Sequence, residues 1–289
     1  MKMNYQIAKN LVFVFIPMFV VLFFQNCGKA PEAENSTTTP VSTCSTTQLA
    51  QLETNMTSTL STATSEVDFS FLVERADGRQ FSYSRGSSTL TTSYESASTS
   101  KLISAIIILR LVDQGYLTLN SKPQDFITSW PILSTDPLYN MTLRNLLSFT
   151  SGLNDDPGCI NFNVSFDSCV NTIATTNENK GITPGTQYYY ASSHLQVAGL
   201  MAVKAKGVAT WQDVFTAFKN ETGLFSTATY DLPSTTNPRL AGGMHWTATE
   251  YLDFLRALKN GTLLSSTLQN EFLADQIPTA TVTIAYSPI

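Results

Sequence analysis

The chain has 289 residues, of which 43% are hydrophobic and 13% charged, with a formal net charge of −5 at pH 7. An acidic chain does not offer the positive surface that nucleic acid requires, so nothing in the composition favours a nucleic-acid partner. Only two histidines are present, and no Cys/His group has the spacing of a zinc site, so the sequence predicts neither a metal site nor an organic cofactor.

Residues 1–26 have the composition of a secretion signal. Lys2 and Lys9 stand without an acidic residue ahead of an apolar run from Leu11 to Phe24. That run is shorter than the about 20 residues of a membrane-spanning helix. Cys27 follows closely, which indicates a bacterial lipoprotein whose lipidated Cys27 becomes the mature N-terminus and holds the protein at the membrane of the cell envelope. An uncleaved N-terminal anchor is the alternative.

Residues 27–47 are expected to form a tether. They are rich in Ser, Thr, Pro and Glu and lack apolar periodicity, so they cannot bury enough surface to offset chain entropy. The remaining residues 48–289 suit one large domain or two intimately packed lobes.

The first predicted elements of this domain are a helix, a hairpin and a second helix. Leu49, Leu52, Met56 and Leu60 recur at helical spacing. Alternating segments 67–74 and 79–85 flank Asp77-Gly78, which is typical of a two-residue hairpin turn. Residues 98–114 then form a helix that is apolar nearly all round, so it should be buried centrally.

Most of the later segments are predicted to be helical. The sequence predicts helices after Thr142, over residues 193–206, after Thr210, and after the capping patterns Thr247/Glu250 and Ser266/Gln269. Only residues 281–286 have a strand pattern. The order of elements predicts an α/β (α+β) fold in which an antiparallel sheet is built from both chain ends beside a helical lobe.

Ser98 and Lys101 are the candidate nucleophile and base. Residues three apart on a helix share a face, so the Lys101 amine can reach the Ser98 hydroxyl. A lysine among apolar neighbours near a helix N-terminus has a depressed pKa and can accept the serine proton. The alternative is structural: Ser98 caps the helix, and Lys101 extends to water from its first turn.

Four ordered stretches resemble the serine β-lactamase-related superfamily, which includes class C β-lactamases, penicillin-binding DD-peptidases and related esterases. The segment from Tyr94 to Lys101, ahead of its apolar helix, resembles the first motif. Residues 142–153 resemble Thr-Leu-Arg-x-Leu-Leu-x-His-Thr-Ser-Gly-Leu. The third match is Pro184-Gly185-Thr186 with residues 190–192, which resembles Pro-Gly-Thr and Tyr-x-Asn/Ser. The fourth is Asn237-Pro238-Arg239 with residues 241–244, which resembles the Ala-Gly-Gly-Leu stretch. The resemblance covers residues 66 to 286 and implies a β-lactamase/transpeptidase-like fold.

By this resemblance Tyr190 is the second catalytic residue, which moves protons among Ser98, substrate and water, and Ser192 helps to hold the substrate or Lys101. The alternative for Tyr190 is a half-buried aromatic residue beside Tyr188 and Tyr189. A triad through His194 or His245 is not expected, because no Gly-x-Ser-x-Gly turn presents a serine.

Cys159 and Cys169 are the natural disulfide pair of an exported chain, because they flank the polar loop 160–168. Cys44 lies in the tether and would be left without a partner.

The third motif of the superfamily, Lys-Thr/Ser-Gly or His-x-Gly on a late strand, is absent from the sequence, so we expect the domain to be incomplete at its C-terminus. Three explanations stay open: a fragment of a complete enzyme, an inactive lipoprotein that binds a peptidoglycan-like ligand or a partner, or a site completed in another way. The function predicted is that of a serine hydrolase forming an acyl-enzyme on a D-alanyl peptide, a β-lactam or an ester.

Overall fold

The computed structural model describes residues 45–62, 66–276 and 281–282. The expected secretion signal, Cys27 and Cys44 lie outside these residues. The chain divides into two compact units, residues 1–88 and residues 89–289. Within the described part of the chain, no helix combines the length and apolar character needed to cross a membrane.

The first unit contains the predicted helix and hairpin. Helix α2 spans Thr46–Thr62, and strands β1 (Phe69–Glu74) and β2 (Gln80–Arg85) pair antiparallel. The turn is longer than the two residues expected. The Arg75 amide donates to the Arg79 carbonyl, and Gly78 adopts φ 83°, so three residues form the loop and glycine takes the left-handed position.

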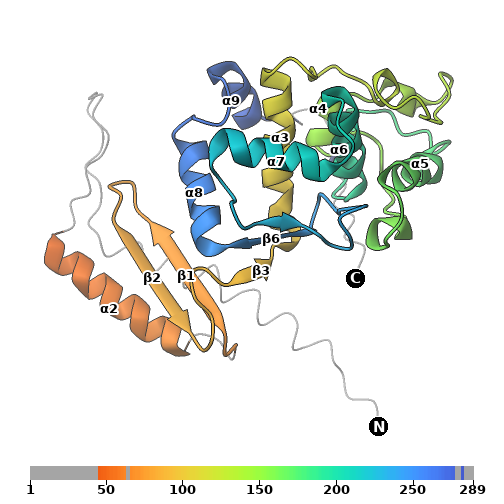
Figure 1. The fold of residues 1–289 in the computed structure, drawn as a ribbon. Helices are drawn as coiled ribbons and strands as arrows, with labels where there is room; N and C mark the ends of the chain where they lie inside the picture. The colour runs from red at the N-terminus through yellow and green to blue at the C-terminus, as the bar shows by residue number, and fades with distance from the viewer. Residues whose placement is uncertain (1–44, 63–65, 277–280, 283–289) are drawn as a thin grey trace, which may run out of the picture. The chain divides into compact units, whose positions relative to one another are not determined.

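The second unit begins with strand β3 (Ser93–Glu95), which belongs to a three-stranded sheet and lies below the helices of the unit in the view of Figure 1. Its longer helices are α3 (Ser100–Asp113), α5 (Phe166–Asn177), α6 (Ser193–Lys206), α7 (Trp211–Thr222), α8 (Ala248–Lys259) and α9 (Ser266–Leu273). Its short elements are α4 (Leu143–Leu147), the 3₁₀ turns η1 (Ala97–Thr99), η2 (Pro123–Asp125), η3 (Pro137–Asn140) and η4 (Gly158–Asn161), and strands β4 (Gln187–Tyr188), β5 (Thr229–Tyr230), β6 (Met244–Thr247) and β7 (Thr281–Val282).

Local capping explains where several of these helices begin. Thr142, Thr210 and Thr247 each accept a hydrogen bond from the amide three residues later, and the side chain of that residue returns to the cap. The cap of α9 differs from the prediction, because Ser265, and not Ser266, accepts from the Leu268 amide. Side-chain caps thus satisfy backbone donors that a helix start leaves unpaired.

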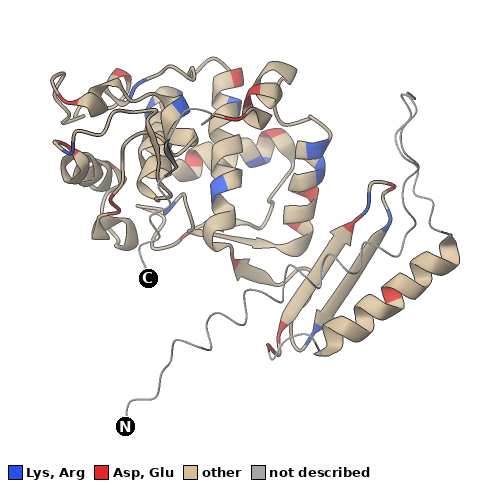
Figure 2. Ribbon diagram, turned by 180° about the vertical axis from the view of Figure 1, so that it is seen from behind, with Lys and Arg blue, Asp and Glu red and all other residues tan. Residues whose placement is uncertain are grey.

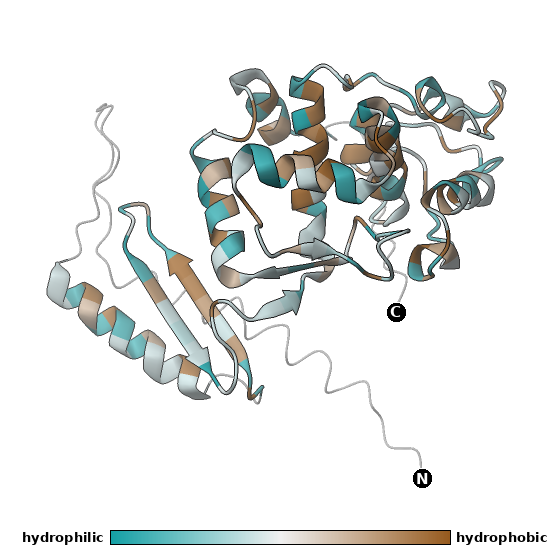
Figure 3. Ribbon diagram, viewed as in Figure 1, coloured by the Kyte–Doolittle hydropathy of each residue, from teal (hydrophilic) through white to brown (hydrophobic). Residues whose placement is uncertain are grey.

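Helix α6 lies at the centre of the second unit. It packs against α3, α4, α5 and α7, and all its residues from Ser193 to Val203 are buried. Both α3 and α6 are strongly apolar (Figure 3). A side-chain carbon at Gly199 would lie 1.9 Å from Leu240 Cδ1, so only glycine permits this close approach. The centre of the core therefore includes α6 as well as the predicted helix α3.

Two sheets of the second unit bring distant segments together. β6 pairs antiparallel with both β3 and β5. β7 pairs in parallel with β4, and thus differs from the antiparallel pairing expected of a returning strand. Arg144 of α4 donates to Glu271 and Gln276, which holds residues 271–276 against α4.

Candidate active site

Ser98 lies in the 3₁₀ turn η1, immediately before α3. The sequence prediction placed it on the first turn of the α-helix itself. The difference arises at Ala97, whose φ of 44° is a conformation that residues with a side chain rarely adopt. Such strain costs on the order of 1–3 kcal/mol and persists only where the surroundings enforce it. The residue before Ser98 is therefore held in place by its neighbours.

Polar neighbours of Ser98 supply this restraint. The Ser96 amide donates to the Met244 carbonyl at 2.8 Å, which ties the turn to β6. Thr99 Oγ1 donates to the Ser96 carbonyl at 2.6 Å, and buried Ser100 donates to the Ala97 carbonyl at 2.9 Å. The small polar residues around Ser98 thus fix the backbone and leave the Ser98 side chain unused by the turn.

Lys101 contacts Ser98 as the spacing predicted. Its Nζ lies 3.0 Å from Ser98 Oγ and donates to the Ala241 carbonyl at 2.8 Å. Burial lowers the pKa of Lys101 below its ordinary value, despite the opposing effect of Tyr190. When the amine is neutral, the Ala241 carbonyl still takes one N–H, and the lone pair is free to accept the Ser98 proton.

Tyr190 completes the cluster. Lys101 Nζ lies 4.5 Å from the centre of its ring. Burial acts to raise the pKa of Tyr190. A hydrogen bond with Ser98 and the charge and hydrogen bond of Lys101 together lower it by more than burial raises it, so the pKa is below its ordinary value. A phenol that ionises more easily beside an ammonium group is suited to transfer protons.

Phe149 supports the Tyr190 ring from a neighbouring loop. The two rings are stacked, with centroids 5.8 Å apart and an interplanar angle of 16°. Phe149 itself adopts φ 59°, a second strained conformation at the site. Its carbonyl accepts from the Tyr189 amide at 2.9 Å. The loop therefore positions Tyr190 through both a ring contact and a backbone hydrogen bond.

His194 is fully buried behind this aromatic pair. Its Nε2 lies 2.8 Å from the Tyr189 carbonyl and its Nδ1 lies 2.8 Å from Ser151 Oγ. A carbonyl only accepts, so Nε2 carries the proton and Nδ1 accepts from the Ser151 hydroxyl. Its ring meets Phe149 edge-on at 5.0 Å. Burial lowers the pKa of His194 to about 4, so the ring is neutral at ordinary pH and acts as a support.

Asp156 holds the beginning of α6. Its carboxylate accepts from the Ser192 and Ser193 amides, both at 2.8 Å, and from Ser193 Oγ at 2.7 Å. It thus satisfies helix N-terminal donors next to Tyr190. Ser192, predicted to bind substrate or Lys101, makes no side-chain hydrogen bond within the described residues, and its hydroxyl remains available to a ligand.

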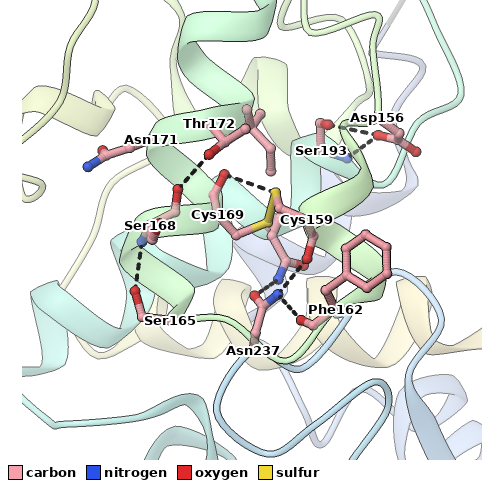
Figure 4. Close-up of a disulfide and its surroundings, with 12 residues drawn as sticks. Asp156, Cys159, Phe162, Ser165, Ser168, Cys169, Asn171, Thr172, Ser193 and Asn237 are labelled. Atoms are coloured by element: carbon pink, nitrogen blue, oxygen red, sulfur yellow. Dashed lines mark hydrogen bonds between the residues drawn. A yellow bond between two sulfur atoms is a disulfide. The ribbon is translucent and has the colours of Figure 1, made fainter.

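Cys159 of η4 and Cys169 of α5 form a disulfide, as the sequence predicted (Figure 4). Beside it, the buried Asn237 side chain donates to the Cys159 carbonyl at 2.9 Å and to the Phe162 carbonyl at 3.1 Å. Figure 4 also shows Asp156 directed toward Ser193. One loop therefore carries both the disulfide and the carboxylate that caps α6.

The structure brings Ser98, Lys101 and Tyr190 together, whereas the hydrogen-bond partner of His245 is Asp231, at 2.6 Å. Sequence reasoning did not identify Phe149 or Asp156. Phe149 occupies the histidine position of the quoted family pattern, and this departure was the available signal. In the described ranges, no group of three or more His, Cys, Asp or Glu side chains is arranged to hold a metal ion.

A buried helix beginning at a serine–lysine pair, an antiparallel sheet beside it and a helical lobe define the β-lactamase/transpeptidase-like fold. The family model described as Beta-lactamase matches residues 72–284. The chain belongs to this family, whose members are typically serine hydrolases that act on amide or ester bonds.

Solved structures agree with this fold. A provisionally named beta-lactamase from Bacteroides dorei DSM 17855 is 25% identical, with a TM-score of 0.68 over 81% of this chain and 72% of its own. A penicillin binding protein from Bacillus halodurans is 21% identical, with a TM-score of 0.56 over 71% and 73%. A D-stereospecific amidohydrolase from Streptomyces sp. is 19% identical, with a TM-score of 0.61 over 78% of each chain.

Proposed function

We propose that this protein is a serine hydrolase that cleaves an ester or amide bond through an acyl-enzyme on Ser98. The observation that supports it best is the distance of 3.0 Å between Lys101 Nζ and Ser98 Oγ, on a lysine whose pKa burial lowers. Tyr190 adds a second proton carrier in contact with both. This arrangement supplies an activated nucleophile without a histidine.

In the first step Ser98 Oγ attacks the substrate carbonyl. The Lys101–Tyr190 pair accepts the hydroxyl proton as the carbon–Oγ bond forms. The bond to the leaving oxygen or nitrogen then breaks, and the pair returns the proton to that atom. The product of this step is an ester of Ser98 and a neutral leaving group.

In the second step a water molecule attacks the acyl carbon. The same pair accepts the water proton and delivers it to Ser98 Oγ as the carbon–Oγ bond breaks. The acid is released and Ser98 is restored. One pair thus serves both half-reactions, because the pKa of each member is lowered from its ordinary value, which helps the pair to take up and return a proton.

The substrate classes we propose are D-alanyl peptides, β-lactams and small esters. The proteins with similar structures are named as a beta-lactamase, a penicillin binding protein and an amidohydrolase. All three classes present a carbonyl that a serine hydroxyl can attack to form an acyl-enzyme. Ser192, with its unused hydroxyl beside Tyr190, is proposed to contact the substrate.

Covalent labelling tests this function. The wild-type protein should take up a fluorescent β-lactam or a fluorophosphonate, and Ser98→Ala should lose the label. Ser129→Ala, at an exposed serine, is the matched control and should label as the wild type does. If wild type takes neither label, or if Ser98→Ala labels equally well, the proposal is wrong.

We also propose that the protein is exported and anchored to the bacterial cell envelope through lipid on Cys27. The charged and apolar pattern of residues 1–26 supports this. Cells expressing the protein should incorporate labelled palmitate into it and retain it in the membrane fraction. Cys27→Ser should abolish the label, and a labelled Cys27→Ser protein would refute the anchor.

A further inference from the structure

Lys101 is held in the candidate site by a neutral backbone acceptor. Basic and acidic positions are interspersed on the helices of the second unit (Figure 2), and Lys204, for example, pairs with Asp167. Lys101 forms no ion pair within the described residues, and its Nζ donates to the Ala241 carbonyl at 2.8 Å. A carbonyl can hold the amine in one place only if the backbone segment that carries it is itself fixed.

Ser104 binds this segment from the helix that carries Lys101. It follows Lys101 by three residues on α3, so the two side chains share one face of the helix. Ser104 Oγ donates to the Leu240 carbonyl at 2.7 Å, and Lys101 donates to the carbonyl of the next residue, Ala241. One face of α3 therefore binds two consecutive carbonyls, which sets how residues 240–241 lie along the helix.

The direction of each hydrogen bond at Ser104 follows from its partners. Ser104, Leu240 and Tyr230 are all fully buried, and Tyr230 Oη lies 2.8 Å from Ser104 Oγ. Because a carbonyl only accepts, the single hydroxyl proton of Ser104 goes to Leu240, and Tyr230 must donate to Ser104. Burial raises the pKa of Tyr230, which keeps its phenol protonated as a donor. Tyr230 thus orients Ser104, and Ser104 makes the bond to the segment.

A second set of contacts holds the segment against other parts of the unit. Gln196 of α6 accepts from the Leu240 amide at 3.3 Å and donates to the Pro238 carbonyl at 3.0 Å. A side-chain carbon at Gly243 would lie 2.1 Å from the Leu232 carbonyl oxygen, so only glycine permits this close approach. Neither contact involves α3. Within the described part of the chain, the side chains of α3 that bond to residues 237–243 are those of Lys101 and Ser104.

We propose that Ser104 is a positioning residue for the reaction of Ser98. Its bond to the Leu240 carbonyl places the Ala241 carbonyl, which takes one N–H of Lys101 and leaves the amine directed at Ser98 Oγ. Ser104 itself does not contact the substrate. The inference rests on the proposed hydrolase function for its catalytic meaning. A displacement of about 1 Å near a reacting group can lower a rate by about 100-fold, so loss of this bond should slow acylation.

The rate at which Ser98 takes up the fluorescent β-lactam or the fluorophosphonate, measured over a range of label concentrations, tests the proposal. Ser104→Ala should lower the maximal rate by about 10- to 100-fold. The half-saturating concentration should change little, because the buried Ser104 does not reach the label. Ser104→Cys keeps a similar shape with a weaker donor and should have an intermediate maximal rate.

Tyr230→Phe is the matched control. It removes one buried hydroxyl from the same chain of hydrogen bonds but leaves Ser104 able to donate to Leu240. Its maximal rate should therefore stay near that of wild type. Thermal unfolding checks that each variant is folded. The inference is overturned if both Ser104 variants are acylated at the wild-type rate, or if Tyr230→Phe is slowed as much as Ser104→Ala.

Crystal structures of the same variants do not depend on activity. In Ser104→Ala the Ala241 carbonyl should lie beyond about 3.5 Å from Lys101 Nζ, outside hydrogen-bond distance. In Tyr230→Phe the distance should stay near 2.8 Å. If the bond persists unchanged in Ser104→Ala, Ser104 does not position Lys101.

The two measurements separate this inference from the proposed function. Labelling that depends on Ser98 but not on Ser104 refutes the Ser104 assignment alone. A wild-type protein that takes neither label, but whose bond from Lys101 to Ala241 breaks in Ser104→Ala, refutes the hydrolase function and retains the positioning of Lys101.

Discussion

His194 should make the stability of the protein depend on pH. Its ring is fully buried, and both nitrogens are engaged, Nε2 by the Tyr189 carbonyl and Nδ1 by Ser151. Burial lowers its pKa from 6.5 to about 4. The unfolded chain therefore takes up a proton at a pH where the folded protein does not, and acid favours unfolding.

The magnitude follows from the two pKa values. The contribution of neutral His194 is complete above pH 6.5 and is lost as the pH falls from there to about 4. A tenfold change in proton affinity corresponds to about 1.4 kcal/mol. The free energy of unfolding should thus decline by about 2 kcal/mol by about pH 5, and by about 3 kcal/mol near pH 4, from this residue alone.

The assay compares wild type with His194→Gln by urea unfolding, followed by tryptophan fluorescence, from about pH 7 to about pH 4.5. The amide of Gln can still donate to the Tyr189 carbonyl but does not titrate. The difference in free energy of unfolding between the two proteins should shrink as the pH falls. His245→Gln removes the only other histidine and assigns the effect to one ring. A difference that stays constant with pH would refute the reasoning.

Three further predictions concern the site and its supports. Lys101→Met should lower kcat/KM for an ester by about 100- to 10,000-fold, the usual range for a lost general base, and a normal rate would exclude Lys101 from catalysis. Phe149→Leu should lower kcat by about 2- to 10-fold with little change in KM, because an aromatic pair with Tyr190 is worth about 0.5–1.5 kcal/mol; an effect on KM alone would contradict this role. Replacing Cys159 and Cys169 by Ser should lower the free energy of unfolding by about 2–3 kcal/mol in urea titrations, from loop entropy, and an unchanged value would show that the loop is restrained otherwise.

The elements that depend on local chemistry were predictable from the sequence. Helix α8 begins after Thr247 because the cap and Glu250 lie within four residues, and the boundaries of α6 were predicted at Ser193 and Lys206. The parallel pairing of β7 with β4 was not predictable, because a local pattern of residues does not show which strand will be its partner. The length of the hairpin loop was also predicted wrongly, because Asp77-Gly78 fits both a two-residue and a three-residue loop.

The candidate site likewise has some features that the sequence predicted and others that depend on the folded structure. The contact between Lys101 and Ser98 followed from a spacing of three residues, and Tyr190 from an ordered motif. The strained Ala97 has no sequence signature, because its conformation is imposed by hydrogen bonds from neighbouring elements.

The hydrogen bond from Lys101 to the Ala241 carbonyl joins residues 140 positions apart. The pKa of Lys101 is lowered by burial, which the folded protein provides and the unfolded chain does not. In a chain still unfolded, the same amine is hydrated and protonated and the serine beside it is an ordinary alcohol. Under the proposed mechanism, Ser98 becomes a nucleophile only on folding, and a newly made chain would carry no reactive serine until most of its second unit has assembled.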